Sequence, residues 1–398
     1  MIKNRNFIWN MIGNSLNSFL SLFLLIIVTR INGIELSGMF SYAFTLTLIL
    51  QMISNYGGRI YQVSDYNEEF KFAEYLGSRV KTSFISIIIL LLFCIYNKFD
   101  DNFMYISLSL MGLRIIETFS DVIYASFQKN DRLDKIGKSL TMKSLLILLL
   151  FYIIEFTTKN IKYSSIMILI ASLIIFLCYD IPNIKIYEKL KISYNNQIYD
   201  KSKYIFLLGF ITLLILNTGR FVAKNNINDI AIGYLGILMM IPTVMSLVSQ
   251  FIIQPEIINL TNFCNKNQHD QFNHIKNKMI KSLLLFSILC ILISITLGPF
   301  VLKLLYKLNF NNYRFAFVLL ILSGTFNGLT SLYSNILTIL RHTKIQFNIY
   351  IIVLIINTIF SYLLSKFYGL YGIFFALLIA MFIQYILFYL NYLKFKNS

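Results

Sequence analysis

Apolar stretches of about twenty residues recur along the whole of this chain, with short polar segments between them. A stretch of this length is what an α-helix needs to cross a bilayer, and it is about twice as long as a barrel strand. Because lipid offers no hydrogen bonds to the backbone, the pattern predicts an all-α integral membrane protein. Twelve spans are expected, at residues 7–31, 39–59, 82–97, 103–127, 140–157, 163–180, 204–223, 230–257, 280–297, 313–340, 346–365 and 370–393.

The composition agrees with lipid as the main solvent. Hydrophobic residues make up 57% of the chain and charged residues only 13%, whereas a soluble domain carries about a quarter charged residues. The net charge of +17 comes from lysines in short loops and not from one face, so it indicates membrane topology and no nucleic-acid binding. The first apolar run has no small-residue cleavage site, which favours a retained helix. The histidines and cysteines lack metal-ligand spacing, so no metal or cofactor is expected.

The lysines and arginines are distributed unevenly over alternate loops. Roughly 24 of them fall on one set of loops and roughly 10 on the other, and the richer set includes both termini. This predicts a bacterial plasma-membrane protein with both termini in the cytoplasm. One lysine-rich segment lies at the midpoint of the chain. We therefore expect an N-terminal six-helix bundle at 1–180, a cytoplasmic linker at 181–203 and a C-terminal six-helix bundle at 204–398, around a central cavity.

The fourth expected span contains ionisable residues, which are costly in lipid. Arg114, Glu117, Asp121, Tyr124 and Gln128 are three or four residues apart, so they share one face of a helix. One interpretation is a local ion pair between Arg114 and Glu117. The other is that Arg114 lines a substrate lumen while Glu117 or Asp121 serves a coupling ion, H⁺ or Na⁺.

Two other spans place a polar stripe beside an arginine. In the second span Asn55 and Arg59 lie on one face, and in the seventh span Asn217, Arg220 and Lys224 do the same. An alternative for Arg59 is that its side chain snorkels to the cytoplasmic surface, and for Lys224 that it lies at the membrane interface. The position of Arg220 is deep enough in its span for the lumen.

The first span carries Asn14 within a stripe of polar residues, whereas Arg30 falls on nearly the opposite side of an ideal helix and is also a candidate for the adjoining loop. Together with the arginines above, these residues predict a cationic, hydrated cavity. Arginine binds phosphate with two parallel hydrogen bonds, so such a cavity suits a phosphate-bearing cargo.

Several short motifs occur in a recognisable order along the chain. They are TRING at 29–33 with GMF at 38–40, YGGRIYQVSD at 56–65, NTGRFV at 217–222, GYLG at 233–236 with Pro255, and YGLYG at 368–372. With their spacing over twelve spans, the chain resembles the polysaccharide-repeat flippases of the multidrug/oligosaccharidyl-lipid/polysaccharide exporter superfamily along essentially its full length.

The resemblance implies a V-shaped pair of bundles that works by alternating access. It implies a cargo of polyprenyl-diphosphate-linked oligosaccharide, moved to the outer leaflet for O-antigen, capsule or a similar polysaccharide, with polysaccharide polymerase machinery as a possible partner. In such relatives arginines of the first, second and seventh helices hold the diphosphate, which corresponds to Arg30, Arg59 and Arg220 in this sequence.

Two alternatives stay open at the level of sequence. A multidrug or cation antiporter of the same superfamily would be expected to offer an acidic or aromatic cavity, and the arginines argue against it. A polyprenyl-dependent glycan polymerase or glycosyltransferase would want acidic catalytic residues on a sizeable outer loop. Asp100 and Asp101 are the one outer acidic pair in the sequence, and a solvated turn explains them. A transporter without enzyme activity is therefore the preferred interpretation.

Overall fold

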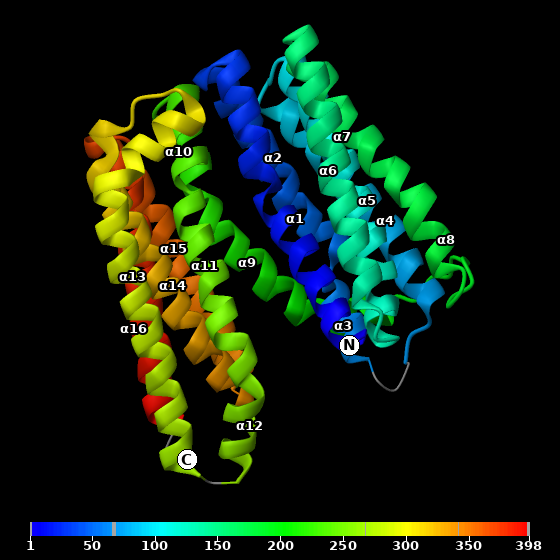
Figure 1. Ribbon diagram of the computed structural model, residues 1–398, viewed down its shortest axis with the longest axis vertical. Helices are drawn as coiled ribbons and strands as arrows, with labels where there is room; N and C mark the ends of the chain where they lie inside the picture. The colour runs from blue at the N-terminus through cyan, green and yellow to red at the C-terminus, as the bar shows by residue number, and fades with distance from the viewer. Residues whose placement is uncertain (1, 66–68, 267, 341, 396–398) are drawn as a thin grey trace. The chain divides into compact units, whose positions relative to one another are not determined.

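The computed structural model describes residues 2–65, 69–266, 268–340 and 342–395, and within these ranges it is helical and contains no strand. The chain divides into two compact units, Met1–Leu213 and Leu214–Ser398. Helix α9 (Gln197–Asn226) runs through the boundary. In Figure 1 the first unit extends from blue to green and the second from green to red.

Eleven helices of the described chain are long and apolar enough to cross a membrane. The remaining expected span coincides with α5 (Asp101–Lys129), a helix of 29 residues. Its interior charges, Arg114, Glu117 and Asp121, explain why hydropathy alone passes over it. The all-α, multi-pass fold with about twelve spans in two bundles is thus confirmed.

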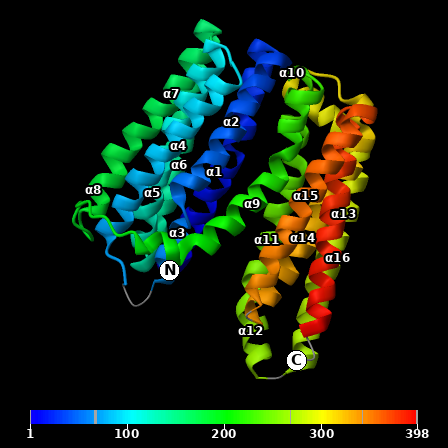
Figure 2. The ribbon, with the colours of Figure 1, turned by 180° about the vertical axis from the view of Figure 1, so that it is seen from behind.

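The spanning helices of the first unit pack on one another as one connected bundle. Helix α1 packs along α6, α2 packs on α4 and α5, and α7 packs on both α5 and α6. Figure 2 shows α4 to α7 side by side. The elements are α1 (Ile2–Asn32), α2 (Ile34–Asn55), α3 (Gly58–Ser64), α4 (Phe72–Tyr96), α5, α6 (Leu133–Thr158), α7 (Ile161–Ile175), the π-helix η1 (Phe176–Asp180) and α8 (Ile181–Ile184).

Glycines set how closely α1 and α6 approach. A Cβ atom built on Gly13 would lie 2.4 Å from the carbonyl oxygen of Gly137, and one built on Gly137 would lie 2.1 Å from that of Trp9. Any larger residue at either position would force the two backbones apart, as in other small-residue helix crossings in membranes.

The second expected span does not end at Arg59, because the backbone breaks before it. Tyr56, Gly57 and Gly58 all have positive φ, at 32°, 88° and 53°, a region that glycine enters without strain. Helix α2 therefore stops at Asn55, and Arg59 becomes the second residue of the short helix α3. The break changes the direction of the chain just where polar residues cluster.

The segment after α8 folds back onto the first unit. The amide of Ser193 donates to the carbonyl of Ala73 at 3.0 Å, and the side-chain amide of Asn195 donates to Glu74 at 2.9 Å. Both partners lie in the first turn of α4. This lysine-rich stretch is therefore fixed against the cap of a spanning helix.

The second unit centres on α14, the most buried of its spans. Helix α14 packs on α11, α13 and α16, and α15 packs on α16 (Figure 1). Gly324 and Gly328 allow the α11 contact, since added Cβ atoms would lie 2.5 Å from Met245 and 2.2 Å from Ser249. The unit contains the end of α9, α10 (Asp229–Leu238), α11 (Met240–Ile253), η2 (Gln254–Glu256), α12 (Ile257–Asn265), α13 (His269–Tyr306), η3 (Asn311–Tyr313), α14 (Arg314–Ile339), α15 (Thr343–Tyr368) and α16 (Leu370–Phe395).

Candidate functional site

Arg114 forms the centre of a polar cluster between α2 and α5. Its Nη1 donates to Glu117 Oε2 at 2.7 Å, and Gln51 Nε2 donates to the same oxygen at 3.0 Å. The guanidinium also lies over the ring of Phe44, 4.3 Å from its centroid. The predicted Arg114–Glu117 ion pair is therefore present. Nevertheless Nε and Nη2 of Arg114 are buried and have no hydrogen-bond partner among the described residues.

The side chain of Asp121, which belongs to α5, lies against the break between α2 and α3. Its Oδ2 accepts a hydrogen bond from the backbone amide of Arg59 at 3.1 Å, and it would be 3.5 Å from a Cβ atom on Gly58. The carboxylate thus occupies the N-terminus of α3, where free amides favour a negative charge. Asn55 lies next to it, and its buried Oδ1 is unpartnered within the described chain. Of the predicted residues, Asn55, Arg59 and Asp121 are thus brought together here.

Arg79 on α4 was not among the residues predicted from the sequence. It is 1% exposed, its Nη1 donates to Ser78 Oγ at 3.2 Å, and its charge acts on Asp121. The hydropathy pattern places the start of this span at residue 82, whereas α4 begins at Phe72. One sequence signal could have revealed Arg79. Polar residues continue to recur about every four positions before the apolar run that starts at residue 82, as is typical of an amphipathic helix.

Asn14 and Arg30 on α1 lie apart from this cluster. Both side chains are exposed. Asn14 donates to the carbonyl and the side chain of Asn10, one turn earlier in the same helix, at 2.7 and 2.9 Å.

In the second unit, Arg220 and Lys224 occupy one side of α9. Nη1 of Arg220 donates to Asn217 Oδ1, one turn earlier, while its buried Nε is unpartnered in the described chain. Lys224 Nζ donates to Asp229 Oδ1 at 2.6 Å, and both side chains are about one-third exposed. Arg220 therefore keeps donor capacity, whereas the charge of Lys224 is balanced by the start of α10.

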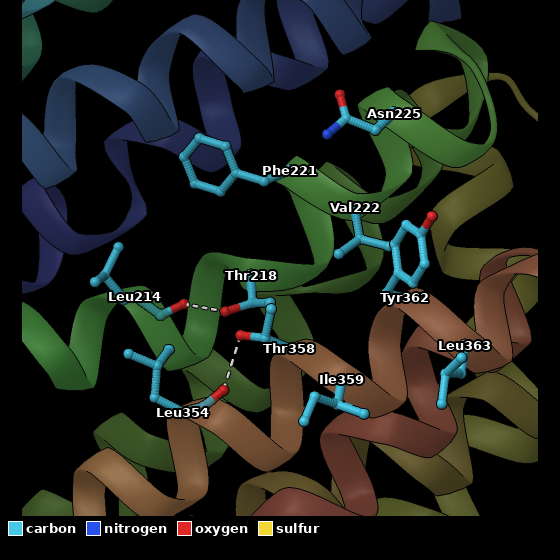
Figure 3. Close-up of a pocket in the computed structure, with 10 residues that line it drawn as sticks. All are labelled: Leu214, Thr218, Phe221, Val222, Asn225, Leu354, Thr358, Ile359, Tyr362 and Leu363. Carbon is cyan, nitrogen blue, oxygen red and sulfur yellow. Dashed lines mark hydrogen bonds between the residues drawn. The ribbon is translucent and has the colours of Figure 1, made fainter.

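An apolar groove runs between α9 and α15 of the second unit, with a volume of about 660 Å³ (Figure 3). The hydroxyls of Thr218 and Thr358 donate to the carbonyls of Leu214 and Leu354 in their own helices, at 2.7 and 2.8 Å. These two hydroxyls therefore need no polar ligand. The groove is lined by Leu214, Thr218, Phe221, Val222, Asn225, Leu354, Thr358, Ile359, Tyr362 and Leu363.

A second polar network lies along α5, and of its members the sequence singled out only Tyr124. Lys143 Nζ lies 3.3 Å from Asp180 Oδ2, and both side chains are almost fully buried. Ser120 and Ser139 donate to the two carboxylate oxygens at 2.9 and 2.5 Å, and Tyr124 bonds Ser139 at 2.7 Å. The network joins α5, α6 and η1. Because each charge has several partners, it stabilises the helix contacts and leaves little capacity for a ligand.

Among the described residues, eleven apolar helices of spanning length and the further long helix α5, with buried arginines and carboxylates in the first unit, are typical of a multi-pass membrane protein with a polar interior. Over the described residues, no group of histidine, cysteine, aspartate and glutamate side chains could hold a metal ion.

We compared the chain with known protein families and proteins. No protein-family model matches the chain. The chain is 25% identical to the capsular polysaccharide biosynthesis protein CapF of Staphylococcus aureus, over 98% of this chain and 99% of that protein.

Solved structures show the same fold. The lipid II flippase MurJ in an inward closed conformation superposes with a TM-score of 0.73 at 18% identity, covering 96% of this chain and 87% of that chain. An inward-facing multidrug resistance transporter of the MATE family superposes with a TM-score of 0.70 at 11% identity, covering 98% of both chains. The likeness to the multidrug/oligosaccharidyl-lipid/polysaccharide exporter superfamily that the motifs indicated is confirmed, and the chain has the fold of its transporters.

Proposed function

We propose that this protein is a flippase that carries a polyprenyl-diphosphate-linked oligosaccharide from the cytoplasmic to the outer leaflet of a bacterial plasma membrane. The glycan would be a repeat unit of capsule or a similar surface polysaccharide. Two likenesses support the proposal: the relative CapF is named for capsular polysaccharide biosynthesis, and MurJ is named as a lipid II flippase. O-antigen is the alternative destination of the same chemistry.

The observation that carries the proposal is the state of Arg114 and Arg220. They lie in different units, and among the described residues two buried guanidinium nitrogens of Arg114, Nε and Nη2, and one of Arg220, Nε, have no hydrogen-bond partner. A guanidinium binds a diphosphate through paired, charge-assisted hydrogen bonds, and this gain offsets the cost of burying the donors. Arg59 and Arg30 are further candidates for the same role, with Asn14, Asn55 and Lys224 as polar neighbours.

The apolar groove of α9 offers a surface for the polyprenyl tail. It extends from Leu214 to Asn225, about 16 Å along the helix, while Arg220 and Lys224 project from another side of the same helix. One helix would thus present an apolar surface and a cationic one to an amphiphile whose tail is apolar and whose headgroup is anionic. A Leu363→Trp change, which fills the groove, should reduce transport of long-tailed more than of short-tailed substrates.

Alternating access would move one bundle relative to the other. In this proposal the residues at 1–180 and 204–398 rock about the segment 181–203, and both termini remain in the cytoplasm. Moving two negative charges outward from an inside-negative cytoplasm is favoured by about 4.6 kcal/mol per 100 mV, so the membrane potential contributes to the drive. A polymerase on the outer side would then consume the flipped repeat unit.

Complementation tests the proposal. A bacterial strain that lacks its own repeat-unit flippase receives the wild type, Arg220→Ala or Arg314→Ala, together with the cognate glycan pathway, and surface polysaccharide and lipid-linked precursor are measured. We expect the wild type and Arg314→Ala, an exposed arginine at the start of α14, to restore surface glycan, and Arg220→Ala to leave precursor inside. Equal failure of all three, with expression confirmed, would favour a cation antiporter or a glycan-transferring enzyme.

A further inference from the structure

Glu155 is a carboxyl group that the cluster around Arg114 does not include. It lies in the last turn of α6 and is 0% exposed. Neither of its carboxylate oxygens has a hydrogen-bond partner anywhere in residues 2–65, 69–266, 268–340 and 342–395. It contrasts with Glu117 on α5, whose Oε2 accepts from both Arg114 and Gln51.

The two buried residues that directly precede Glu155 on its face of α6 are apolar. Glu155 follows Ile147 and Phe151 at four-residue intervals on the buried face of α6, and the Phe151 ring lies 5.8 Å from that of Phe40. At the end of the helix, Asn32 of α1 donates to the carbonyl of Lys159 at 3.2 Å, which ties α1 to the turn that follows Glu155. The buried Oδ1 of Asn32 is another acceptor without a donor in the described chain.

The charged side chains at the ends of the surrounding helices form no hydrogen bond with it. They are Arg30 on α1, Glu35 on α2, Asp101 on α5, Lys159 on α6 and Lys162 on α7. Lys162 instead lies over the ring of Tyr105, 5.2 Å from its centroid. The carbonyl end of α6 adds a negative partial charge, which opposes an ionised carboxylate in the same turn.

We propose that Glu155 is a proton-binding site, occupied by a proton in this conformation. An unpaired carboxylate inside a membrane protein is far more costly than a neutral acid, so the proton is the simplest ligand that resolves the site. The exchange is a plain protonation: the carboxylate gains one proton and loses it when the end of α6 becomes hydrated. A sodium ion would need several oxygen ligands at once. Among the described residues at this end of α6, the unpartnered side-chain oxygens are those of Glu155 and Asn32.

The site gives the proposed flippase a route for proton coupling, and this part of the inference rests on the proposed function. With both termini in the cytoplasm, α6 is the fifth span and ends at the outer surface, so Glu155 would exchange its proton with the outside. Glu117 and Asp121, the carboxylates expected from the sequence, already hold hydrogen bonds from Gln51, Arg114 and Arg59. Glu155 is the better candidate because it has none.

Labelling with dicyclohexylcarbodiimide tests proton occupancy without any cargo. This reagent adds to protonated carboxyl groups in apolar surroundings, and peptide mass spectrometry locates the adduct. In wild-type protein in lipid vesicles, we expect Glu155 to be labelled and Glu117 to stay unlabelled, with labelling that falls about tenfold per pH unit once the proton dissociates. A Glu155→Gln variant should lose that adduct and keep any others.

Three results would overturn the proposal. No adduct at Glu155 in the wild type, equal labelling of Glu117, or protection of Glu155 by sodium at constant pH would each do so, and the last would assign a sodium site. The contribution of this proton site to transport is tested separately, by comparing the surface polysaccharide restored by Glu155→Gln and by Glu155→Asp in the complementation assay. Because labelling needs no glycan, a wrong cargo would leave its result unchanged.

Discussion

The two units of the molecule bury different kinds of polar group. Among the described residues, every fully buried charged side chain belongs to the first unit, whereas Arg220 of the second unit is half-buried: the fully buried ones are Arg79, Arg114, Asp134, Lys135, Lys143, Glu155 and Asp180. The second unit buries polar residues as well, but all of them are neutral serines, threonines, asparagines and glutamines. Its core also carries an aromatic cluster, in which Tyr333 contacts Tyr385, Tyr389 and Tyr392 at 5.3 to 6.0 Å between ring centroids.

This difference shows that two helix bundles can hold their helices together by different chemistry. A buried charge must find partners of fixed geometry, so the helices of the first unit are held by specific electrostatic contacts. Hydroxyls and amides bond mainly to nearby backbone, which leaves shape as the main determinant of the second unit. We therefore expect single changes of polar residues to be costly in the first unit and mild in the second.

The largest effect should follow from Asp180→Ala. The change leaves Lys143 buried without its carboxylate, and breaking one partner of a buried pair costs about 3–5 kcal/mol. Thermal unfolding of the purified protein in detergent should show a large drop in midpoint. The double variant Lys143→Met, Asp180→Leu removes both charges and should recover most of that loss. If the double variant is as unstable as the single one, the network does not hold the unit by charge pairing.

Arg114→Met should lower transport, and it should also lower the free energy of unfolding, because Glu117 loses its ion-pair partner. The change keeps an apolar stem over Phe44 and removes the charge, so the loss is that of charge-assisted bonds to the cargo, about 1.5–3 kcal/mol, or about 10- to 100-fold in transport at low substrate. Lys135→Met is the matched control, because Lys135 is also buried and contacts the rings of Phe127 and Tyr187. Equal loss of transport in both variants would point to a general effect of charge on the unit.

The sequence predicts the spans of both units well but only part of the first unit's polar interior. Length and hydropathy are local properties, so the order of the helices is visible in the chain. The Arg114–Glu117 pair was also predictable, because residues three apart in a helix must meet. Lys143 and Asp180 are 37 residues apart in sequence, and only the packing of α6 against η1 brings them together. No periodicity encodes such a contact.

Arg79 and Glu155 were missed for a different reason. Both lie near the end of an apolar run, where a charged residue normally reaches water by snorkelling. Burial of Arg79 depends on the segment after α8, whose position hydropathy does not predict. This segment covers α4 just before Arg79, since the carbonyl oxygen of Ser193 would lie 1.9 Å from a Cβ atom on Gly77. Burial of Glu155 depends on the packing of α1 against the end of α6, where Asn32 donates to the carbonyl of Lys159. Both features require the tertiary structure.

A moderate effect is expected from Gln346→Ala in the second unit. Gln346 is buried, accepts from Ser334 Oγ at 2.7 Å and donates to Thr338 Oγ1 at 3.0 Å, so it links α14 to α15. Both former partners can turn to their own helix, and we expect a loss of about 1 kcal/mol in unfolding free energy. Gln271→Ala, an exposed position on α13, is the control and should be silent. A loss as large as that of Asp180→Ala would remove the contrast between the units.

The smallest effect should come from Thr358→Val in the groove. Valine keeps the shape of threonine, and the lost hydroxyl bonds only the carbonyl of Leu354 in its own helix. Since that carbonyl already takes part in the helix, stability should change by no more than about 0.5 kcal/mol. Transport of a long-tailed substrate should be maintained if the groove binds an apolar chain, because the new methyl group adds apolar contact. A clear loss of transport in Thr358→Val, with stability retained, would mean that a polar group of the cargo reaches this groove, and the tail would then have to lie elsewhere.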